Sequence, residues 1–202
     1  SMAESIISVS GLRGIVGQSL NPEVVIRYVS AFAAALRPGA IVVTYDGRTT
    51  GPMIVDAVRA TLTAAGREVL DAGPAATPTT GVLVTALGAA GAVQVSASHN
   101  PPEYNGLKLF NDAGRVIPAG EGQQVLQLYR SGGDPSIWKS HDRVGRAERV
   151  GDPSKAHLDR LLKICDVAAI RRRKFRVLLD SNHGAGAVAG QPLLEALGCE
   201  LT

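Results

Sequence analysis

The sequence predicts an α/β fold: a three-layer α/β/α domain around a mixed, mostly parallel sheet, followed by the truncated start of a second, similar α/β domain. Short apolar runs alternate with segments of helical period along most of the chain, as expected for layered α/β proteins. Residues 41–45 form a continuous apolar run, which is typical of a strand covered on both faces. A polar, Gly-rich stretch at 131–151 interrupts this alternation, and a new strand and helix follow it.

The first segment predicts a strand, a turn and a helix. Residues 6–9 are a strand candidate, and residues 10–14 form a Gly-rich sequence that we expect to be a turn. A helix then begins at Asn21-Pro22-Glu23, which combines a capping side chain, a proline at the first helical position and an early acid. Pro38-Gly39 ends it.

The following segments repeat the alternation. Strands are expected at 41–45, 69–72 and 92–96, with a helix after each of the first two. A hairpin is expected around residues 111–114 and a helix over 121–130.

We place the domain boundary at residue 150. Residues 1–150 then form the first domain, and residues 151–202 form a partial second domain. The second part predicts a helix over 157–165, a strand over 175–180 and a helix ending at Gly198. We expect the basic run 171–174 to be a solvated turn, and an unpaired strand–helix–strand unit to leave apolar surface exposed.

Composition excludes several classes of protein. Hydrophobic residues make up 45% and charged residues 19% of the 202 residues, which favours a packed core over disorder. A net charge of +3 and 4% aromatic residues do not indicate nucleic-acid binding. The two cysteines are not close in sequence and indicate no zinc site. With no signal-peptide pattern and no apolar run long enough for a membrane span, we expect a cytoplasmic protein that binds no membrane.

The chemistry is concentrated after the strand at 92–96. Pro101 and Pro102 stiffen the loop and prevent a helix there, so the Ser98 hydroxyl stands in a rigid polar setting suited to a nucleophile. His99 and Lys108 are candidates for proton transfer or for neutralising phosphate. These residues alone also fit a plain connection whose serine and asparagine bond the backbone, and both interpretations stay open.

Other known loops do not match. The serine is not in a Gly-x-Ser-x-Gly elbow, which disfavours an α/β-hydrolase. Walker A and Gly-x-Gly-x-x-Gly patterns are absent from the sequence. Because ligands bind beyond the carboxyl ends of strands in open sheets, we expect the loops 11–14, 46–51 and 96–101 to converge.

Residues 96–108, which read Ser-Ala-Ser-His-Asn-Pro-Pro-Glu-Tyr-Asn-Gly-Leu-Lys, closely resemble the active-site loop of the α-D-phosphohexomutases. This family contains phosphoglucosamine mutases, phosphomannomutases and phosphoglucomutases. Gly11–Gly14 resembles its Gly-x-Arg-Gly turn, Tyr45–Gly51 its Asp-x-Arg loop and Gly73–Thr80 its Thr-Pro loop. Asp180–Gly186 is similar to the start of its second domain, so the resemblance covers nearly the whole chain.

The resemblance implies a four-domain, Mg²⁺-dependent enzyme that interconverts 6-phospho and 1-phospho sugars. A phosphoserine gives its phosphoryl group to a hexose phosphate, and a sugar bisphosphate is the intermediate; glucose 1,6-bisphosphate or a similar compound is the activator. Carried over, Ser98 is the phosphoserine and supplies one metal ligand through its phosphate. Lys108 matches a proton carrier, Arg13 matches a residue that neutralises the phosphoryl group or assists proton transfer, and His99 matches the histidine beside the serine.

The resemblance also implies that parts of the family's four-domain enzyme are absent from this sequence. No Asp-Gly-Asp-x-Asp-Arg metal loop occurs in this sequence, nor do the family's third- and fourth-domain loops. We therefore expect an N-terminal fragment that is inactive alone and lacks domains II–IV as partners. The loop sequence ranks glucosamine phosphate first among hexose phosphates, with phosphomannomutase or phosphoglucomutase activity as the alternative. A homo-oligomer is compatible with the sequence.

Two rivals come from other classes. One is a non-catalytic sugar-phosphate-binding module, which Ser98, Arg13 and Lys108 together disfavour because a binder needs no nucleophile. The other is a serine hydrolase. Among the remaining residues, Asp46 and Arg48 are expected to brace a loop, Asp180 to cap a turn, and Tyr104 and Asn105 to shape the active loop. His141, His157 and His183 are expected to be structural or on the surface.

Overall fold

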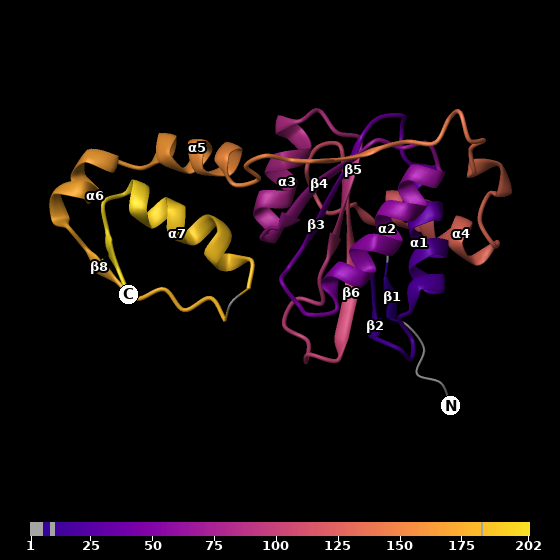
Figure 1. Ribbon diagram of the computed structural model, residues 1–202, viewed down its shortest axis with the longest axis horizontal. Helices are drawn as coiled ribbons and strands as arrows, with labels where there is room; N and C mark the ends of the chain where they lie inside the picture. The colour runs from indigo at the N-terminus through magenta and orange to yellow at the C-terminus, as the bar shows by residue number, and fades with distance from the viewer. Residues whose placement is uncertain (1–5, 9–10, 183) are drawn as a thin grey trace.

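A computed structural model describes residues 6–8, 11–182 and 184–202. In this part of the chain, a seven-stranded sheet has the order β1-β2-β6-β5-β3-β4-β7 (Figure 1). Its strands are β1 (Ile6–Ser8), β2 (Gly11–Ile15), β3 (Ile41–Tyr45), β4 (Val69–Pro74), β5 (Gly91–Val95), β6 (Tyr104–Asn111) and β7 (Ala147–Arg149). Pairings from β1 to β5 are antiparallel, and those joining β5, β3, β4 and β7 are parallel.

Helices cover both faces of this sheet. On one face, α1 (Pro22–Ala35), α2 (Gly51–Ala64) and α4 (Ala119–Arg130) pack on a core that includes Leu12, Val43 and Leu107. On the other face, α3 (Thr77–Ala86) packs on a smaller core around Val42 and Phe110. Figure 1 shows α3 on the opposite side of the strands from α1 and α4. The three-layer α/β/α architecture with a mixed sheet is therefore confirmed, but the parallel pairings are not a majority.

Local sequence explains where the elements begin. The Asn21 side chain accepts a hydrogen bond from the backbone N–H of Val24 at 3.0 Å, and Pro22 is the first residue of α1. The β3 residues 41–44 are all buried, in agreement with the continuous apolar run. The expected hairpin forms as a turn with one bridge between Phe110 and Val116. A short 3₁₀ helix at Pro135–Ile137 interrupts the polar stretch before β7.

The expectation of a turn at residues 10–14 is wrong for the described residues 11–14. They belong to β2, which pairs antiparallel with β6 in the register Gly11–Lys108 to Ile15–Tyr104. The glycines serve close strand contact instead of a turn: a Cβ added at Gly11 would overlap the carbonyl oxygen of Leu107. Ser10, like Val9 of the expected strand 6–9, lies outside the described residues.

The remaining residues form a second unit, shown at the left of Figure 1. It contains α5 (Lys155–Ile164), α6 (Val167–Arg173), β8 (Arg176–Val177), α7 (Gly186–Ala196) and β9 (Glu200–Leu201). β8 and β9 pair in parallel. The strand expected at 175–180 covers only 176–177. Ile164 and Leu178 are 81% and 78% exposed, which agrees with the expected apolar surface.

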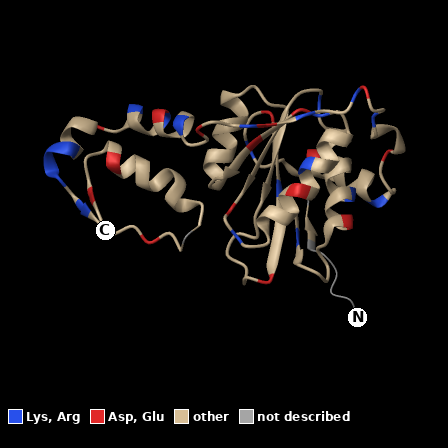
Figure 2. Cartoon of the chain, in the orientation of Figure 1, with Lys and Arg blue, Asp and Glu red and all other residues tan. Residues whose placement is uncertain are grey.

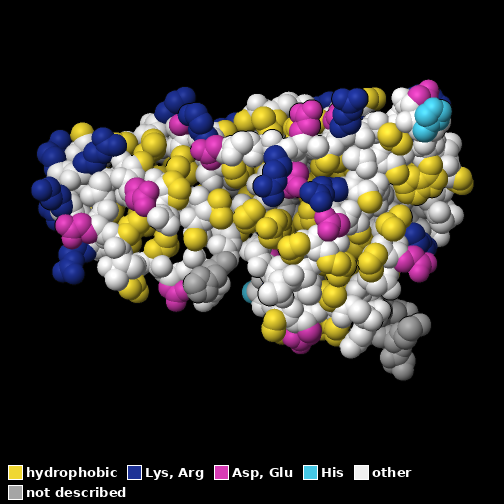
Figure 3. All heavy atoms as spheres, viewed as in Figure 1, with side chains coloured by type: hydrophobic (Ala, Val, Ile, Leu, Met, Phe, Trp, Pro, Cys, Tyr) yellow, Lys and Arg dark blue, Asp and Glu magenta, His cyan; other side chains and the backbone are white. Residues whose placement is uncertain are grey.

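The basic run 171–174 is a helix end and not a turn. Arg171, Arg172 and Arg173 form the last turn of α6, and Lys174 follows in the left-handed conformation. All four are exposed, and Figure 2 shows this blue end of the molecule far from the seven-stranded sheet; Figure 3 shows Lys and Arg side chains gathered there. Cations in the last turn of a helix interact favourably with its dipole, which explains the helical outcome.

The division at residue 150 stays a proposal. It is supported by β7, which ends at Arg149 and still pairs with β4, and by the hydrogen bond from the Val150 N–H to the Asp71 carbonyl. Among the described residues, no helix has the length and apolar character that a membrane crossing requires.

Candidate active site

The loop after β5 presents Ser98 to solvent at the carboxyl end of that strand. Ser98 is exposed and has a φ of +58°, a left-handed conformation that non-glycine residues rarely adopt. Its backbone N–H donates to the Ser96 hydroxyl at 3.0 Å. The loop therefore displays one hydroxyl on a constrained backbone, which suits a nucleophile.

Two of the expected site residues contact the Ser98 loop. The Nδ1 atom of His99 is 3.3 Å from the Ser98 hydroxyl oxygen. Arg13 reaches the same loop from β2, where its Nη1 donates to the Asn100 side-chain oxygen at 3.2 Å. The structure thus brings Arg13 to the loop that carries Ser98 and His99, through a contact with Asn100, which lies 87 residues further along the sequence.

Asp46 and Arg48 brace this loop from beneath, as expected from the sequence. Their side chains form an ion pair at 3.3 Å, and both are largely buried. The Asp46 carboxylate also accepts a hydrogen bond from the Ser96 hydroxyl at 2.8 Å. The loops after β3 and β5 therefore converge, as expected.

Lys108 lies on the same sheet face as Arg13 and belongs to a polar row. It is in register with Gln94 of β5, which is in register with Thr44 of β3. The Lys108 ammonium donates to the Thr77 hydroxyl at 3.3 Å, and Thr77 donates to Gln94 at 2.8 Å. Burial lowers the pKa of Lys108, the positive charge of Arg13 lowers it further, and Asp46 opposes this effect.

Two hollows are lined by the candidate site residues. A cleft of about 520 Å³ is lined by Ser98, Arg48, Thr77 and Gln94, and by residues 181–182 and 184–186 of the second unit. Arg13 and Lys108 instead line a second hollow of about 360 Å³. Thr77 connects them, since it lines the Ser98 cleft and contacts Lys108. The cleft therefore has a hydroxyl, cations nearby and space for a small molecule.

The turn of the second unit closes one side of the cleft. The Ala185 N–H donates to the Asp46 carbonyl at 3.1 Å, and a Cβ added at Gly47 would lie 3.2 Å from the Gly184 Cα. Asp180 accepts from the Asn182 N–H at 3.0 Å, which confirms its expected capping role.

Metal ligands are scarce in the described part of the chain. It contains no group of three or more His, Cys, Asp or Glu side chains placed to hold an ion. Magnesium prefers several oxygen ligands, so these residues do not form a complete magnesium site.

The other expected residues have structural positions. His157 Nδ1 lies 2.9 Å from the Thr79 hydroxyl and links α5 to α3, while His141 is exposed. Asn105 is fully buried and donates to the Thr50 hydroxyl at 2.9 Å, which agrees with a loop-shaping role. His183 lies outside the described residues.

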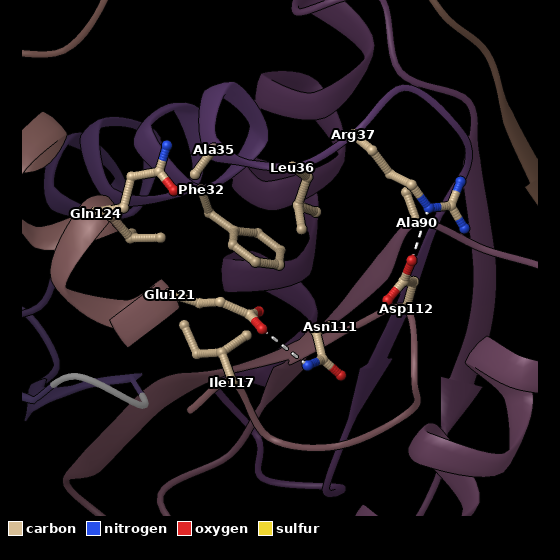
Figure 4. Close-up of a pocket in the computed structure, with 11 residues that line it drawn as sticks. Phe32, Ala35, Leu36, Arg37, Ala90, Asn111, Asp112, Ile117, Glu121 and Gln124 are labelled. Atoms are coloured by element: carbon tan, nitrogen blue, oxygen red, sulfur yellow. Dashed lines mark hydrogen bonds and ion pairs between the residues drawn. The ribbon is translucent and has the colours of Figure 1, made fainter. Parts of the chain in front are cut away.

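A further pocket of about 220 Å³ lies at the opposite end of β5 and β6 (Figure 4). Its rim holds an ion pair between Arg37 and Asp112 at 2.8 Å and a hydrogen bond between Asn111 and Glu121 at 3.2 Å. Figure 4 shows these polar groups around the side chains of Phe32 and Ile117. The residues expected from the sequence do not line it.

Sequence reasoning missed Gln94 and gave Thr77 no individual role. Gln94 is 1% exposed, and its amide also donates to the Ala75 carbonyl at 2.9 Å. The signal was present: a glutamine in an otherwise apolar buried strand must bond to something.

Comparison with known proteins places this site in a family. Residues 5–134 match the sequence model of "Phosphoglucomutase/phosphomannomutase, alpha/beta/alpha domain I". A phosphoglucosamine mutase of Synechococcus sp. (strain CC9605) is 34% identical over 195 residues, which cover 95% of this chain and 41% of that protein. A phosphoglucomutase/phosphomannomutase of Thermococcus kodakarensis is 33% identical, with 95% of this chain and 42% of that protein covered.

Solved structures agree. The structure of a phosphoglucomutase/phosphomannomutase family protein from Burkholderia thailandensis matches with a TM-score of 0.79 and 27% identity, covering 100% of this chain and 44% of the other. The chain spans about two fifths of the length of the curated relatives it matches. Sequence, fold and the Ser98 loop therefore converge, and the chain belongs to the phosphoglucomutase/phosphomannomutase family, whose α/β/α domain I it contains.

Proposed function

We propose that the protein containing this chain is a hexose-phosphate mutase that interconverts 6-phospho and 1-phospho sugars, with Ser98 as the residue that carries the phosphoryl group. The single observation that supports this most is the exposed Ser98 hydroxyl on its constrained loop, with His99 beside it and Arg13 bonded to Asn100 of the same loop. Family membership supports the same activity.

The proposed reaction uses this hydroxyl twice. In the first transfer, the bond between phosphorus and the Ser98 oxygen breaks, and phosphorus bonds to a hydroxyl oxygen of the hexose monophosphate, which loses its proton. That proton goes to the Ser98 oxygen. The resulting bisphosphate reorients, Ser98 takes the other phosphoryl group and gives up its hydroxyl proton, and the sugar oxygen that is released takes up a proton. Phosphoryl transfer needs positioning and charge stabilisation more than covalent help from the protein.

The cations near Ser98 have distinct proposed roles. Arg13 is placed to neutralise charge on the transferred group, because its guanidinium reaches the Ser98 loop. Lys108 is the proposed proton carrier, and its lowered pKa makes proton release easier than from an ordinary lysine. His99 assists the Ser98 hydroxyl, which its Nδ1 contacts.

Magnesium would supply further charge neutralisation when bound. Ser98 is the one residue we propose as a ligand, through an oxygen of its phosphate. Since the described residues do not form a complete site, the remaining ligands would come from outside them. Because the chain spans two fifths of its relatives, we also propose that these 202 residues alone have little mutase activity.

Glucosamine phosphate is the substrate we rank first, with mannose and glucose phosphates as alternatives. Matched proteins named phosphoglucosamine mutase support this order, and one named phosphoglucomutase/phosphomannomutase supports the alternative. A sugar-phosphate-binding module without catalysis is the second candidate function, favoured by the open cleft beside Ser98.

The test measures whether the complete gene product converts sugar 6-phosphates to sugar 1-phosphates. It compares glucosamine, mannose and glucose 6-phosphates in the presence of magnesium and the matching sugar bisphosphate. We expect 1-phosphate product from at least one sugar, and none from Ser98→Ala. Binding of the sugars without conversion in the wild type would favour the binding module. Equal conversion by Ser98→Ala would exclude Ser98 as the phosphoryl carrier.

A further inference from the structure

Arg48 uses every donor of its guanidinium on protein atoms. Its Nε donates to the Asp46 carboxylate at 3.3 Å. Nη1 donates to the carbonyls of Pro101 at 2.8 Å and Tyr104 at 3.1 Å. Nη2 donates to the carbonyls of Ser98 at 3.1 Å and Asn100 at 2.6 Å. A guanidinium has five N–H groups, and these five acceptors account for all of them.

This pattern separates Arg48 from a phosphate-binding arginine. Arg48 lines the cleft that holds Ser98, where an arginine would ordinarily bind a phosphate directly. With five protein acceptors already in place, it has no donor to offer. Arg13, by contrast, donates one side-chain hydrogen bond within the described part of the chain, to Asn100, and so keeps donors for a phosphoryl group.

One of the Arg48 hydrogen bonds goes to Ser98, a residue whose backbone needs support. Ser98 has a φ of +58°, which is unfavourable for a side chain with a Cβ and persists only when its surroundings hold it. Its N–H is held by Ser96, whose hydroxyl donates to Asp46. Its carbonyl is held by Arg48. Both peptide groups flanking the Ser98 Cα are therefore fixed by the single Asp46–Arg48 pair.

We propose that Arg48 is a positioning residue for phosphoryl transfer: it holds the Ser98 loop in its left-handed conformation and aims the hydroxyl, without contacting the substrate. This inference rests on the proposed function of Ser98. Lysine cannot replace Arg48, because an ammonium group has three donors and no planar fork to reach four carbonyls and a carboxylate.

The experiment measures phosphorylation of Ser98 by glucose 1,6-bisphosphate in the complete gene product, over time and across bisphosphate concentrations. Arg48→Lys is expected to lower the saturated rate by about 10- to 100-fold, the range that a misplaced reacting group costs. The concentration for half-maximal rate should stay within about twofold, because no phosphate-binding donor is lost. Added guanidinium ion should partly restore the rate of Arg48→Ala and not that of Arg48→Lys.

Arg37→Lys is the matched control. Arg37 also pairs with a carboxylate and donates to two backbone carbonyls, but it lies at the opposite end of β5 and β6 (Figure 4). Arg37→Lys should leave the saturated rate and the half-maximal concentration unchanged. Ser96→Ala provides a second variant that keeps Arg48 intact, and it should lower the saturated rate in the same way. Circular dichroism and thermal unfolding confirm that each compared variant is folded.

The outcomes separate the two proposals. Absence of phosphorylation in the wild type would overturn the proposed function itself. The positioning role alone would be overturned if the wild type is phosphorylated and folded Arg48→Lys is phosphorylated at an undiminished rate. If Arg48→Lys does not fold, an undiminished rate in Ser96→Ala would overturn it instead. A raised half-maximal concentration with an unchanged saturated rate in Arg48→Lys would also overturn it, because Arg48 would then bind the phosphate directly.

Discussion

Gln94 provides the most direct test of the polar row that supports Lys108. Gln94→Leu removes two hydrogen bonds from a side chain that is 1% exposed: one accepted from the Thr77 hydroxyl and one donated to the Ala75 carbonyl. The Ala75 carbonyl is then left buried without this partner, at a cost of about 2 kcal/mol. Loss of the hydrogen bond from the half-buried Thr77 hydroxyl lowers the free energy of unfolding by about 1 kcal/mol more. Burial of the apolar leucine side chain offsets about 1 kcal/mol of this loss in the free energy of unfolding.

The expected net loss in the free energy of unfolding is therefore about 2 kcal/mol, which corresponds to a fall in Tm of about 4–8 °C. Urea and thermal denaturation followed by circular dichroism measure both. Gln127→Leu makes the same chemical change at an exposed position of α4 and should stay within about 0.5 kcal/mol of the wild type. A Gln94→Leu protein as stable as the Gln127→Leu control would refute the buried hydrogen bonds on which this reasoning depends.

Other contacts lead to four further predictions. The Arg67 side chain donates to four backbone carbonyls at and just beyond the end of α1. Arg67→Met should therefore lower the free energy of unfolding, measured by urea denaturation, by about 2 kcal/mol. An unchanged free energy of unfolding would contradict this capping role. A Cβ at Gly81 would overlap a carbonyl oxygen of the turn after β6. Gly81→Ala should therefore lower the Tm by several degrees, although alanine has the better helix propensity. A rise in Tm would show that the turn moves freely. The pKa of Lys108 is lowered by burial and by Arg13 and raised by Asp46, so Arg13→Gln should raise it in an NMR titration of the Lys108 side chain. Because the unfolded chain binds this proton more tightly, the free energy of unfolding should rise with pH between the lowered pKa and the ordinary value of 10.5, and Lys108→Met should remove that rise.

Much of the fold was predictable because local patterns and packing agree. The buried strand at 41–45 and the helix begun by Asn21-Pro22 each combine an apolar pattern with clear end signals. The prediction failed at Gly11–Gly14, where glycine was interpreted as a turn residue. Glycine permits both tight turns and close approach of strands, and only the pairing with β6 decides between them.

The site was predictable where a residue's role follows from its own loop. Ser98 and His99 lie in one stiff segment, and the sequence places them together. The resemblance placed Arg13 there too, and the structure brings it to Asn100. The contacts of Lys108 with Thr77 and Gln94 depend on the register of β3, β5 and β6, which no local pattern specifies. For the same reason, the number of carbonyls bound by Arg48 could not be predicted from the Asp-x-Arg sequence.

The central claim is that Ser98 carries the phosphoryl group. The most direct measurement is intact mass spectrometry with peptide mapping of the complete gene product after incubation with glucose 1,6-bisphosphate and magnesium, beside Ser98→Ala. The account predicts a gain of one phosphoryl group in the wild type, located on Ser98, and no gain at that peptide in the variant. A wild-type protein that gains no phosphoryl group, or gains one elsewhere while Ser98 stays unmodified, would contradict it.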